Sequence, residues 1–327
     1  MRIVVVTEHA GAADDASRTW VDHLVKALAR LGHEAPVLEL SGKPATAAFT
    51  PATLRALRRL RPDVVQYVPY SGLTRNALVR LRALRLAAPR AVASIAVLYG
   101  VKEVAAGRLL RAPLALASST RLRTVYDDVA RRHAVLPPAV DLDRFVPSEE
   151  APAELRRRLR LDPDRRLVLH VGNFKHHRNL GALARVARGG EQVAMLASPR
   201  YAAPLEVKRE LEEAGVKVVH EFVADLPRWY QAADVYLFQV DDLRGATEIP
   251  QTVVEAMACG TPVATTRFGA LEEFFPPGPG LVYATAAGLD EAIERAAREP
   301  RGANRRLVEA YSIENLAEAV VREYAAV

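Results

Sequence analysis

The segment Thr247–Thr266 combines residues that could bind a phosphorylated ligand. Pro250 suits the first turn of a helix, where its missing N–H does no harm, and Gly260 suits the left-handed position just past a helix end. The segment therefore predicts a helix over Gln251–Ala258 and a strand over Pro262–Thr265. A helix N-terminus offers unbonded N–H groups and the positive end of the helix dipole, and both favour phosphate.

Glu255 lies four residues after Gln251 and therefore on the same face of the predicted helix. Its carboxylate can accept hydrogen bonds from two hydroxyls of a ribose. A helix followed by glycine and a strand is equally compatible with a structural element that exposes a glutamate. Elsewhere, the neighbours His176 and His177 lack a Cys or a third His at a helpful spacing, so we expect no metal site.

Strand-like and helix-like stretches alternate along the chain, which is the pattern of a parallel sheet covered by helices. In the first half we expect strands over Arg2–Thr7, Glu34–Leu40, Val64–Tyr67, Arg90–Ala96 and Leu114–Ser118. We expect helices between them over Trp20–Leu31, Leu54–Leu60 and Leu78–Leu86. These elements predict a first doubly wound domain.

The proline-rich segment Leu136–Pro147 interrupts this alternation and is expected to join two domains. A second α/β unit follows, with a helix over Ala153–Leu161, strands over Leu167–Val171, Val193–Ala197, Val216–His220 and Val235–Phe238, and closing helices over Leu289–Arg298 and Ile313–Tyr324. We place the domains at residues 1–145 and 146–310, with a C-terminal helix over residues 311–327.

The length of 327 residues suits two domains of roughly 150 residues each. The longest apolar runs fall far short of the roughly 20 residues that a membrane span needs, and the N-terminus lacks the order of a signal peptide. The single cysteine, Cys259, excludes an internal disulfide and fits a reducing cytosol. We therefore expect a cytoplasmic protein.

The net charge of +6 has two interpretations. It can be an ordinary solvated surface of an arginine-rich chain, or it can attract phosphate groups or an anionic membrane surface, to which the protein would bind peripherally. A nucleic-acid partner is not expected. The basic residues are spread along helices such as Leu54–Arg61 and Leu155–Leu161, and no aromatic platform lies among them.

The run Pro250–Val263 resembles the nucleotide-sugar motif of retaining GT-B glycosyltransferases of the large family-four type, also called glycosyl transferases group 1, and the match is unbroken over Glu255–Val263. Other stretches resemble the family in the same order, namely Gly32–Glu34, Leu136–Phe145, Leu167–Leu180 and Leu226–Val240. The resemblance is strong from about residue 136 onward and weak before it.

This resemblance implies an α/β protein of GT-B architecture, with two Rossmann-like doubly wound domains facing each other across a cleft. The C-terminal helix would pack back toward the first domain, which would bind the acceptor. The second domain would bind a UDP- or GDP-sugar, and a hexosyl group would be transferred with retained anomeric configuration. No cofactor is implied besides this nucleotide-sugar co-substrate, and the acceptor could be a small molecule, a glycan or a lipid-linked sugar.

Catalysis in such proteins rests mainly on cations and helix N-termini that stabilise the leaving diphosphate. The resemblance therefore places four side chains at the reacting centre, those of His9, Lys175, Arg178 and Glu248. It implies a donor site formed by Gly11, Gly172, Asn173, Lys175, Arg178, Phe222, Val223, Thr247, Glu248, Ile249, Pro250, Gln251, Thr252 and Glu255.

The chain departs from the family pattern at three places. The first glutamate of the motif is replaced by Thr247, with Glu248 one place later. The arginine that follows the loop glycine is replaced by Asn173, whereas the family's loop lysine corresponds to Arg178. The usual pair of glycines after the first strand is reduced to one, which leaves His9 either a role at the reacting centre or an ordinary loop role.

Three functions remain open on these residues. The first is an active retaining glycosyltransferase with an altered sugar preference. The second is a catalytically impaired partner subunit that binds a nucleotide-sugar without turnover. The third and weakest is a UDP-sugar epimerase, which would need more acid and base groups than the first domain offers.

Overall fold

The structure, a computed structural model, describes residues 1–8, 16–40, 50–69, 73–99, 108–121, 123–199 and 201–327. The chain folds into an N-terminal unit, formed by Met1–Ala139 and Ile313–Val327, and a C-terminal unit, Val140–Ser312. Residues 140–145, which the sequence analysis assigned to the first domain, belong to the C-terminal unit. They do so because Phe145 packs into the core of that unit and the Val140 N–H donates to the carbonyl oxygen of Tyr311 at 2.9 Å.

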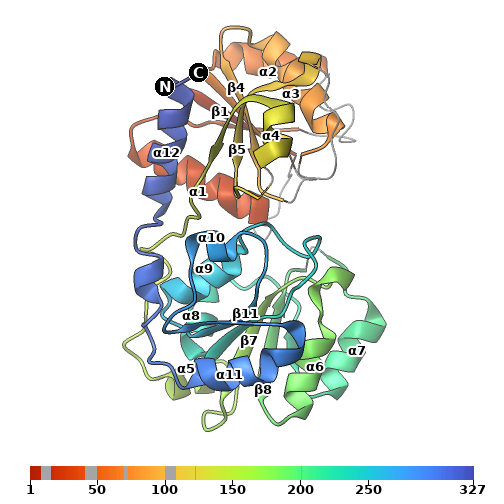
Figure 1. The fold of residues 1–327 in the computed structure, drawn as a ribbon, viewed down its shortest axis with the longest axis vertical. Coiled ribbons are helices and arrows are strands. Elements are labelled where there is room, and N and C mark those ends of the chain that lie inside the picture. Colours follow the sequence, from red (N-terminus) through yellow and green to blue (C-terminus); the bar gives the residue numbers. More distant parts are fainter. Residues whose placement is uncertain (9–15, 41–49, 70–72, 100–107, 122, 200) are drawn as a thin grey trace. The chain divides into compact units, whose positions relative to one another are not determined.

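The N-terminal unit alternates strands and helices (Figure 1). Its strands are β1 (Ile3–Thr7), β2 (Val37–Glu39), β3 (Val64–Val68), β4 (Val92–Val97), β5 (Ala112–Ala117) and β6 (Ala130–Val135). Its helices are α1 (Ala16–Arg30), α2 (Pro51–Leu60), α3 (Arg75–Ala87), the 3-10 helix η2 (Arg108–Leu110), α4 (Arg123–Val129) and the C-terminal α12 (Ile313–Ala325).

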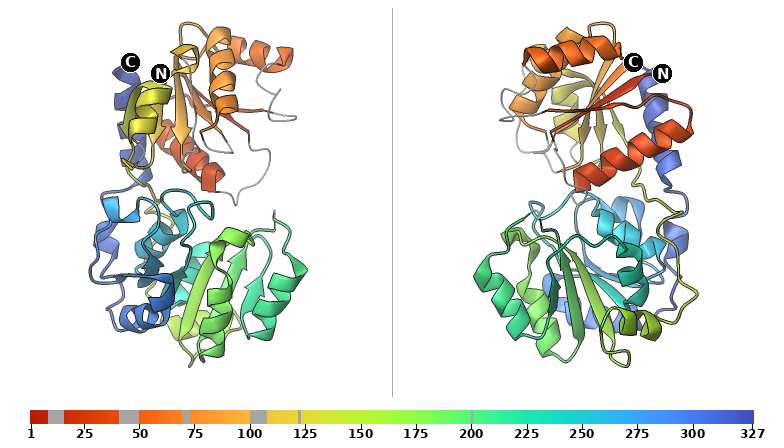
Figure 2. Two further views of the ribbon diagram at one scale, coloured as in Figure 1. Left: turned by 45° about the vertical axis from the view of Figure 1, so that its right-hand side comes forward. Right: turned by 180° about the vertical axis from the view of Figure 1, so that it is seen from behind.

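The six strands of this unit form one parallel sheet in the order β2-β1-β3-β4-β5-β6. Helices α2, α3 and α4 pack on one face of the sheet, and α1 and α12 pack on the other (Figures 1 and 2). The interior strand β1 is buried along its whole length because helices cover both faces. The last helix is fixed by a buried hydrogen bond, in which the Tyr324 hydroxyl donates to the Gln66 side chain at 2.7 Å.

The C-terminal unit repeats this plan. Its strands are β7 (Leu167–Gly172), β8 (Gln192–Ala197), β9 (Lys217–Val219), β10 (Val235–Phe238), β11 (Val263–Thr266) and β12 (Leu281–Ala284). Its α-helices are α5 (Pro152–Arg158), α6 (Gly181–Arg188), α7 (Leu205–Glu213), α8 (Leu226–Ala232), α9 (Gln251–Ala258), α10 (Leu271–Phe274) and α11 (Leu289–Ala297). Its 3-10 helices are η3 (His176–Arg178), η4 (Ala286–Gly288) and η5 (Arg305–Leu307).

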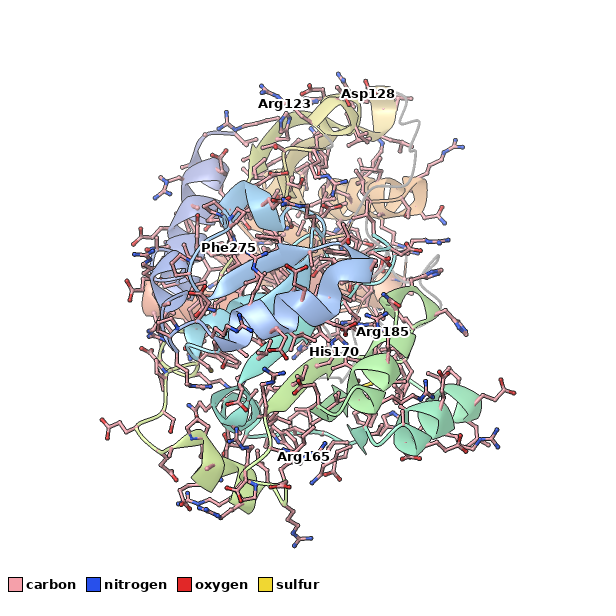
Figure 3. All side chains as sticks on the ribbon, turned by 60° about the horizontal axis from the view of Figure 1, so that its bottom comes forward. Arg123, Asp128, Arg165, His170, Arg185 and Phe275 are labelled. Carbon is pink, nitrogen blue, oxygen red and sulfur yellow. The ribbon has the colours of Figure 1, made fainter. Side chains whose placement is uncertain are left out.

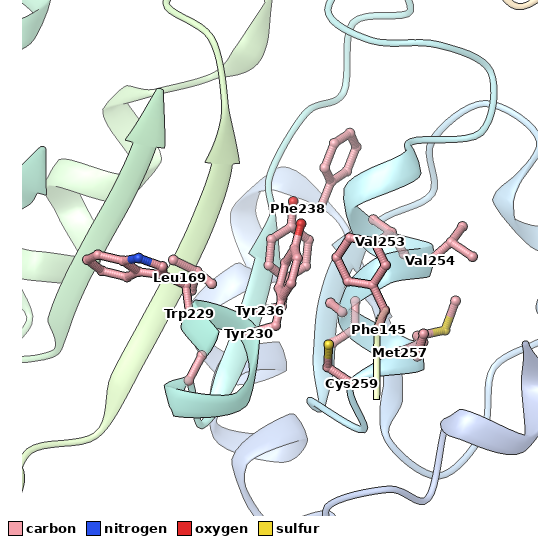
Figure 4. Packing of buried hydrophobic residues seen from close by; sticks show 14 of the residues in the cluster. Phe145, Leu169, Trp229, Tyr230, Tyr236, Phe238, Val253, Val254, Met257 and Cys259 are labelled. Atoms are coloured by element: carbon pink, nitrogen blue, oxygen red, sulfur yellow. The ribbon is translucent and has the colours of Figure 1, made fainter. Parts of the chain in front are cut away.

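The second sheet is also parallel, in the order β12-β11-β10-β7-β8-β9. Counted from β7, this is the strand order 3-2-1-4-5-6 of the Rossmann fold. One of its cores lies between the sheet and α8 and α9, where Tyr230 and Tyr236 lie side by side near Val253 and Met257 (Figure 4). The two doubly wound units confirm the predicted fold class.

Within the part of the chain that the structure describes, none of the helices combines the length and the apolar composition that crossing a bilayer requires.

Candidate functional site

The order of strands in the C-terminal sheet directs attention to the carboxyl ends of β7 and β10. The chain continues from β7 toward β8 on one side, whereas β10 begins the other half of the sheet. Ligands of such sheets bind outside the carboxyl ends of the strands at this reversal point. Here β7 leads into the loop Asn173–Lys175 and η3, and β10 leads into the loop that precedes α9.

Arg178, at the end of η3, joins these two loops. Its side chain is buried, and its guanidinium donates to the carbonyl oxygen of Gly245 at 2.9 Å and to that of Val171 at 3.5 Å. A Cβ at Gly172 would lie 2.5 Å from the Arg178 Nη2, so only glycine leaves room for the guanidinium. Arg178, which the sequence analysis expected at the diphosphate, thus holds the two loops together in this structure.

A pair of amide side chains strengthens the same junction. The Gln239 side chain donates to the Arg178 carbonyl oxygen at 3.0 Å, and the Asn179 side chain donates to the Gln239 carbonyl oxygen at 3.3 Å. Asn179 adopts a left-handed conformation with a φ of 50°, which asparagine tolerates better than most residues. The ends of β7 and β10 are therefore cross-linked in both directions.

His170 lies on β7 (Figure 3). Its ring is fully buried, stacks on Tyr236 and donates from Nδ1 to the Leu237 carbonyl oxygen at 3.0 Å. Burial, together with the charge of Arg178, lowers the pKa of His170 to about 3, so the ring is neutral. The Tyr236 hydroxyl in turn donates to the Thr252 hydroxyl of α9 at 2.6 Å, which anchors the first turn of that helix.

Glu255 lies inside α9 and is only 5% exposed. The hydroxyl of buried Tyr230 donates to its Oε2 at 2.9 Å. Burial raises the pKa of Glu255 to about 7, against the lowering effects of the Tyr230 hydrogen bond and of the Arg144 charge. The structure therefore excludes the exposed glutamate that a purely structural helix would carry.

Side chains from the loops after β7, β8 and β9 also lie along the carboxyl edge of the sheet. Lys175, half-buried, places its Nζ 5.2 Å from the centre of the Tyr201 ring. His220 contacts the Tyr201 carbonyl oxygen at 3.0 Å and packs edge-on against Phe174. Phe222, which follows β9, is 60% exposed and presents an aromatic ring at this edge, and its neighbour Val223 is half-buried.

Residues 247–250, in the first half of the motif, form the segment that leads into α9. The Thr247 hydroxyl donates to the Ile249 carbonyl oxygen at 2.8 Å, and the Glu248 side chain is buried. The Glu248 carbonyl oxygen accepts from the Ala270 N–H at 2.8 Å, which ties this segment to the end of β11. Pro250 is the N-cap of α9 and makes no side-chain capping hydrogen bond to the first turn, in which Gln251 and Thr252 lie.

The structure brings most of the predicted donor residues to one edge of one sheet. Gly172, Asn173, Lys175 and Arg178 lie after β7, and the residues from Thr247 to Glu255 lie between β10 and the middle of α9. Phe222 and Val223 lie farther along the edge, beyond β8. The predicted residues His9 and Gly11 lie outside the described residues.

Sequence reasoning missed three side chains that surround Glu255 and Arg178. They are Arg144, whose Nη2 donates to the Ala224 carbonyl oxygen at 3.2 Å, together with Tyr230 and His170. No spacing in the sequence links Tyr230 to Glu255 or Arg144 to the loop after β9. Arg144 does lie in the Leu136–Phe145 segment, which was assigned to the junction between the domains and to the family resemblance but not to the donor site.

Among the described residues, no group of three or more His, Cys, Asp and Glu side chains could hold a metal ion. His177 instead contacts the Asp242 carboxylate at 3.1 Å.

The two Rossmann-like units define the class of this protein. They form the two-domain α/β fold of GT-B glycosyltransferases. Sucrose-phosphate synthase from Thermosynechococcus elongatus shares this fold with a TM-score of 0.78 at 18% identity, over 100% of this chain and 99% of that chain. Anabaena HepE, in a complex with UDP-glucose, shares it with a TM-score of 0.76 at 14% identity, over 100% of both chains.

The sequence of the second half indicates the family. Residues 165–325 match the family described as glycosyl transferases group 1. D-inositol 3-phosphate glycosyltransferase 2 from Catenulispora acidiphila is 30% identical over 207 residues, which are 55% of this chain and 47% of that protein. The chain spans about half the length of the curated relatives it matches. The resemblance to glycosyl transferases group 1 is confirmed for residues 165–325.

Proposed function

We propose that this chain is a glycosyltransferase that takes a hexosyl group from a nucleotide-diphosphate sugar and transfers it with retained anomeric configuration. The C-terminal unit binds the donor, and the N-terminal unit binds an acceptor. The observation that carries the proposal is the convergence of Lys175, Glu255 and the N-terminus of α9 on the reversal point of a Rossmann sheet. UDP is the first nucleotide to test, because the fold relative HepE binds UDP-glucose.

The donor would lie along the carboxyl edge with its diphosphate at the start of α9. The first-turn N–H groups of the helix favour phosphate through hydrogen bonds and the helix dipole. Lys175 would neutralise the diphosphate as a point charge, and the fixed charge of Arg178 would add to the positive field. Glu255 would accept from the ribose hydroxyls, and Phe222 would contact the base. No metal or other cofactor is part of this proposal.

The decisive experiment measures UDP and GDP binding by isothermal titration calorimetry. We expect Lys175→Gln to weaken nucleotide binding at least about tenfold, because a hydrogen bond to a charged group contributes about 1.5–3 kcal/mol. Lys208→Gln is the matched control, because Lys208 lies on α7 of the same unit and pairs with Glu212. Unchanged affinity in the Lys175 variant, or no nucleotide binding by the native chain, would reject the donor site.

One observation supports a second candidate, a nucleotide-sugar-binding subunit without turnover. The family's first carboxylate is replaced by Thr247, whose hydroxyl already donates to the Ile249 carbonyl oxygen at 2.8 Å, so this position offers the sugar no charged acceptor. A panel of UDP- and GDP-sugars, with mass-spectrometric detection of hydrolysed donor, separates the two candidates. Steady hydrolysis supports the transferase, binding without hydrolysis supports the subunit, and an isomerised UDP-sugar would indicate an epimerase.

A further inference from the structure

The positive charge of the chain is concentrated in one stretch of the N-terminal unit. Between Leu40 and Lys102 there are nine arginines, and Asp63 is the only acidic residue. This excess is larger than the net charge of +6 of the whole chain. The Asp63 carboxylate accepts from the Arg2 backbone N–H at 2.7 Å and so is engaged at the start of the sheet.

Most of these arginines lie on two neighbouring helices. Helices α2 and α3 pack on the same face of the sheet (Figure 1). On α2, Arg55, Arg58 and Arg59 are all exposed at spacings of three and four residues. Like charges at such spacings repel each other and destabilise a helix. The sequence thus keeps an arrangement that is unfavourable for the helix itself.

The exposed arginines of this surface differ from other arginines of the chain in their ion pairs. Within the described part of the chain, the exposed arginines of α2 and α3 form no ion pair, and the one arginine of α3 that does, Arg80, is buried against Glu8. Arginines on other helices behave differently. On α5, for example, Arg157 pairs with Glu154 and Arg158 pairs with Glu150.

Apolar side chains lie among these arginines. Arg75, Val79, Arg82 and Leu86 follow one another along the outer side of α3, and Leu86 is 67% exposed. Leu109 of η2 is 75% exposed, and its carbonyl oxygen accepts from Arg82 at 3.0 Å, which holds η2 beside α3. Arginine alternating with exposed leucine is typical of surfaces that lie on a membrane.

We propose that the outer surface of α2, α3 and η2, here called the basic face, docks on an anionic phospholipid bilayer. The arginines would contact lipid phosphates, and Leu86 and Leu109 would insert at the level of the headgroups. A nucleic-acid partner fits less well, because α2, α3 and η2 contain no aromatic residue on which bases could stack. The basic face is separate from the candidate donor site, which lies in the other unit.

The test is co-sedimentation with 100 nm vesicles in 0.1 M NaCl. We expect the native chain to bind vesicles of phosphatidylcholine and phosphatidylglycerol at 70:30 and to bind pure phosphatidylcholine weakly. Each arginine near an anionic surface contributes about 1 kcal/mol, or about fivefold in partitioning, so Arg55→Gln with Arg59→Gln should weaken binding about 25-fold. The matched control is Arg157→Gln with Arg209→Gln, which removes the same charge from exposed arginines elsewhere and should change binding less than about threefold.

Leu86→Gln with Leu109→Gln should abolish the part of the binding that survives in 0.5 M NaCl, because salt screens the arginines but not the leucines. Circular dichroism and donor hydrolysis should be unchanged in all these variants. Three results would overturn the proposal: no preference of the native chain for anionic vesicles, equal loss in the control pair, or tighter binding to a fluorescent RNA oligonucleotide than to the vesicles. None of these depends on whether the donor site is correctly assigned.

Discussion

Burial of Glu255 makes both stability and nucleotide binding depend on pH near neutrality. The pKa of this carboxyl is raised from its ordinary value of 4.5 to about 7, mainly by burial. Below pH 4.5 the carboxyl is protonated in the folded and the unfolded chain, and its effect on stability is neutral. Between pH 4.5 and 7 the unfolded chain ionises while the folded chain stays protonated, so the free energy of unfolding falls as pH rises.

The size of this effect follows from the pKa shift. One pKa unit corresponds to 1.36 kcal/mol, so the rise from 4.5 to about 7 corresponds to a loss of about 3 kcal/mol by pH 8. Glu255→Gln keeps the shape of the side chain and cannot ionise. The variant should therefore lack this loss, and it should be more stable than the native chain at pH 8 relative to pH 5.

Urea unfolding at several pH values measures the effect in the relevant unit. The chain has two tryptophans, Trp20 in the N-terminal unit and Trp229 in the C-terminal unit. In a Trp20→Phe background, fluorescence reports only on Trp229, which is buried near the Glu255 core. Tyr230→Phe is the matched variant: it removes the hydrogen bond that lowers the Glu255 pKa, and so should move the midpoint above pH 7.

Nucleotide binding should follow the same titration if the ionised carboxylate accepts from the ribose. With a pKa of about 7, affinity for UDP at pH 6 should be about tenfold lower than at pH 8, and Glu255→Gln should show no such slope. A stability loss that is identical in the native chain and in Glu255→Gln would refute the burial reasoning. A flat binding profile together with the expected stability loss would refute only the ribose role.

Two further predictions concern packing. Gly172→Ala places a methyl 2.5 Å from the Arg178 Nη2 and 2.7 Å from the His170 Nε2. We therefore expect the free energy of unfolding in urea to fall by about 1–3 kcal/mol and UDP binding to weaken. Gly181→Ala, where the added methyl meets open space, should change neither quantity. Tyr324→Phe removes the hydroxyl that donates to the buried side-chain oxygen of Gln66 on β3. We expect the free energy of unfolding to fall by about 1–3 kcal/mol and hydrogen exchange in α12 to become faster. Unchanged exchange would contradict this anchoring role.

The interior of both sheets could be predicted from the sequence because central strands are buried on both faces and form continuous apolar runs. The strand Val235–Phe238 and the helix Gln251–Ala258 have the predicted bounds. Two strands were not predicted, β6 and β12, and both are edge strands. Exposed Arg131 and Arg132 interrupt the apolar pattern of β6, since an edge strand needs less burial.

The starts of α2 and α3 were placed one turn too late. Both helices begin after a threonine, and the Thr50 and Thr74 hydroxyls accept from the backbone N–H three residues later at 3.2 and 3.1 Å. Apolar periodicity does not mark a first turn, because that turn is held by its cap and its side chains need not be buried. For α2, the Thr50-Pro51 pair in the sequence indicates the start of the helix, because threonine suits the N-cap and proline suits the first turn.

The candidate site was only partly predictable, because a motif names the residues of one segment and not the side chains that surround it. Glu255 and the start of α9 follow from the motif, but Tyr230 and Arg144 approach from other segments. The burial that raises the Glu255 pKa is a property of the folded unit. Its consequence for pH dependence could not be derived from the order of residues.

The two substitutions in the family pattern share a local feature that bears on the proposed activity. Asn173 accepts through its side-chain oxygen from the Lys175 N–H at 3.3 Å, and Thr247 donates to the Ile249 carbonyl oxygen at 2.8 Å. Each residue therefore stabilises a turn directly before a group that the proposal uses, Lys175 in one loop and Pro250 in the other. Both turns fix the backbone beside the proposed phosphate site whether or not the chain turns its donor over. The donor-hydrolysis panel, and not this geometry, therefore separates an altered donor preference from loss of turnover.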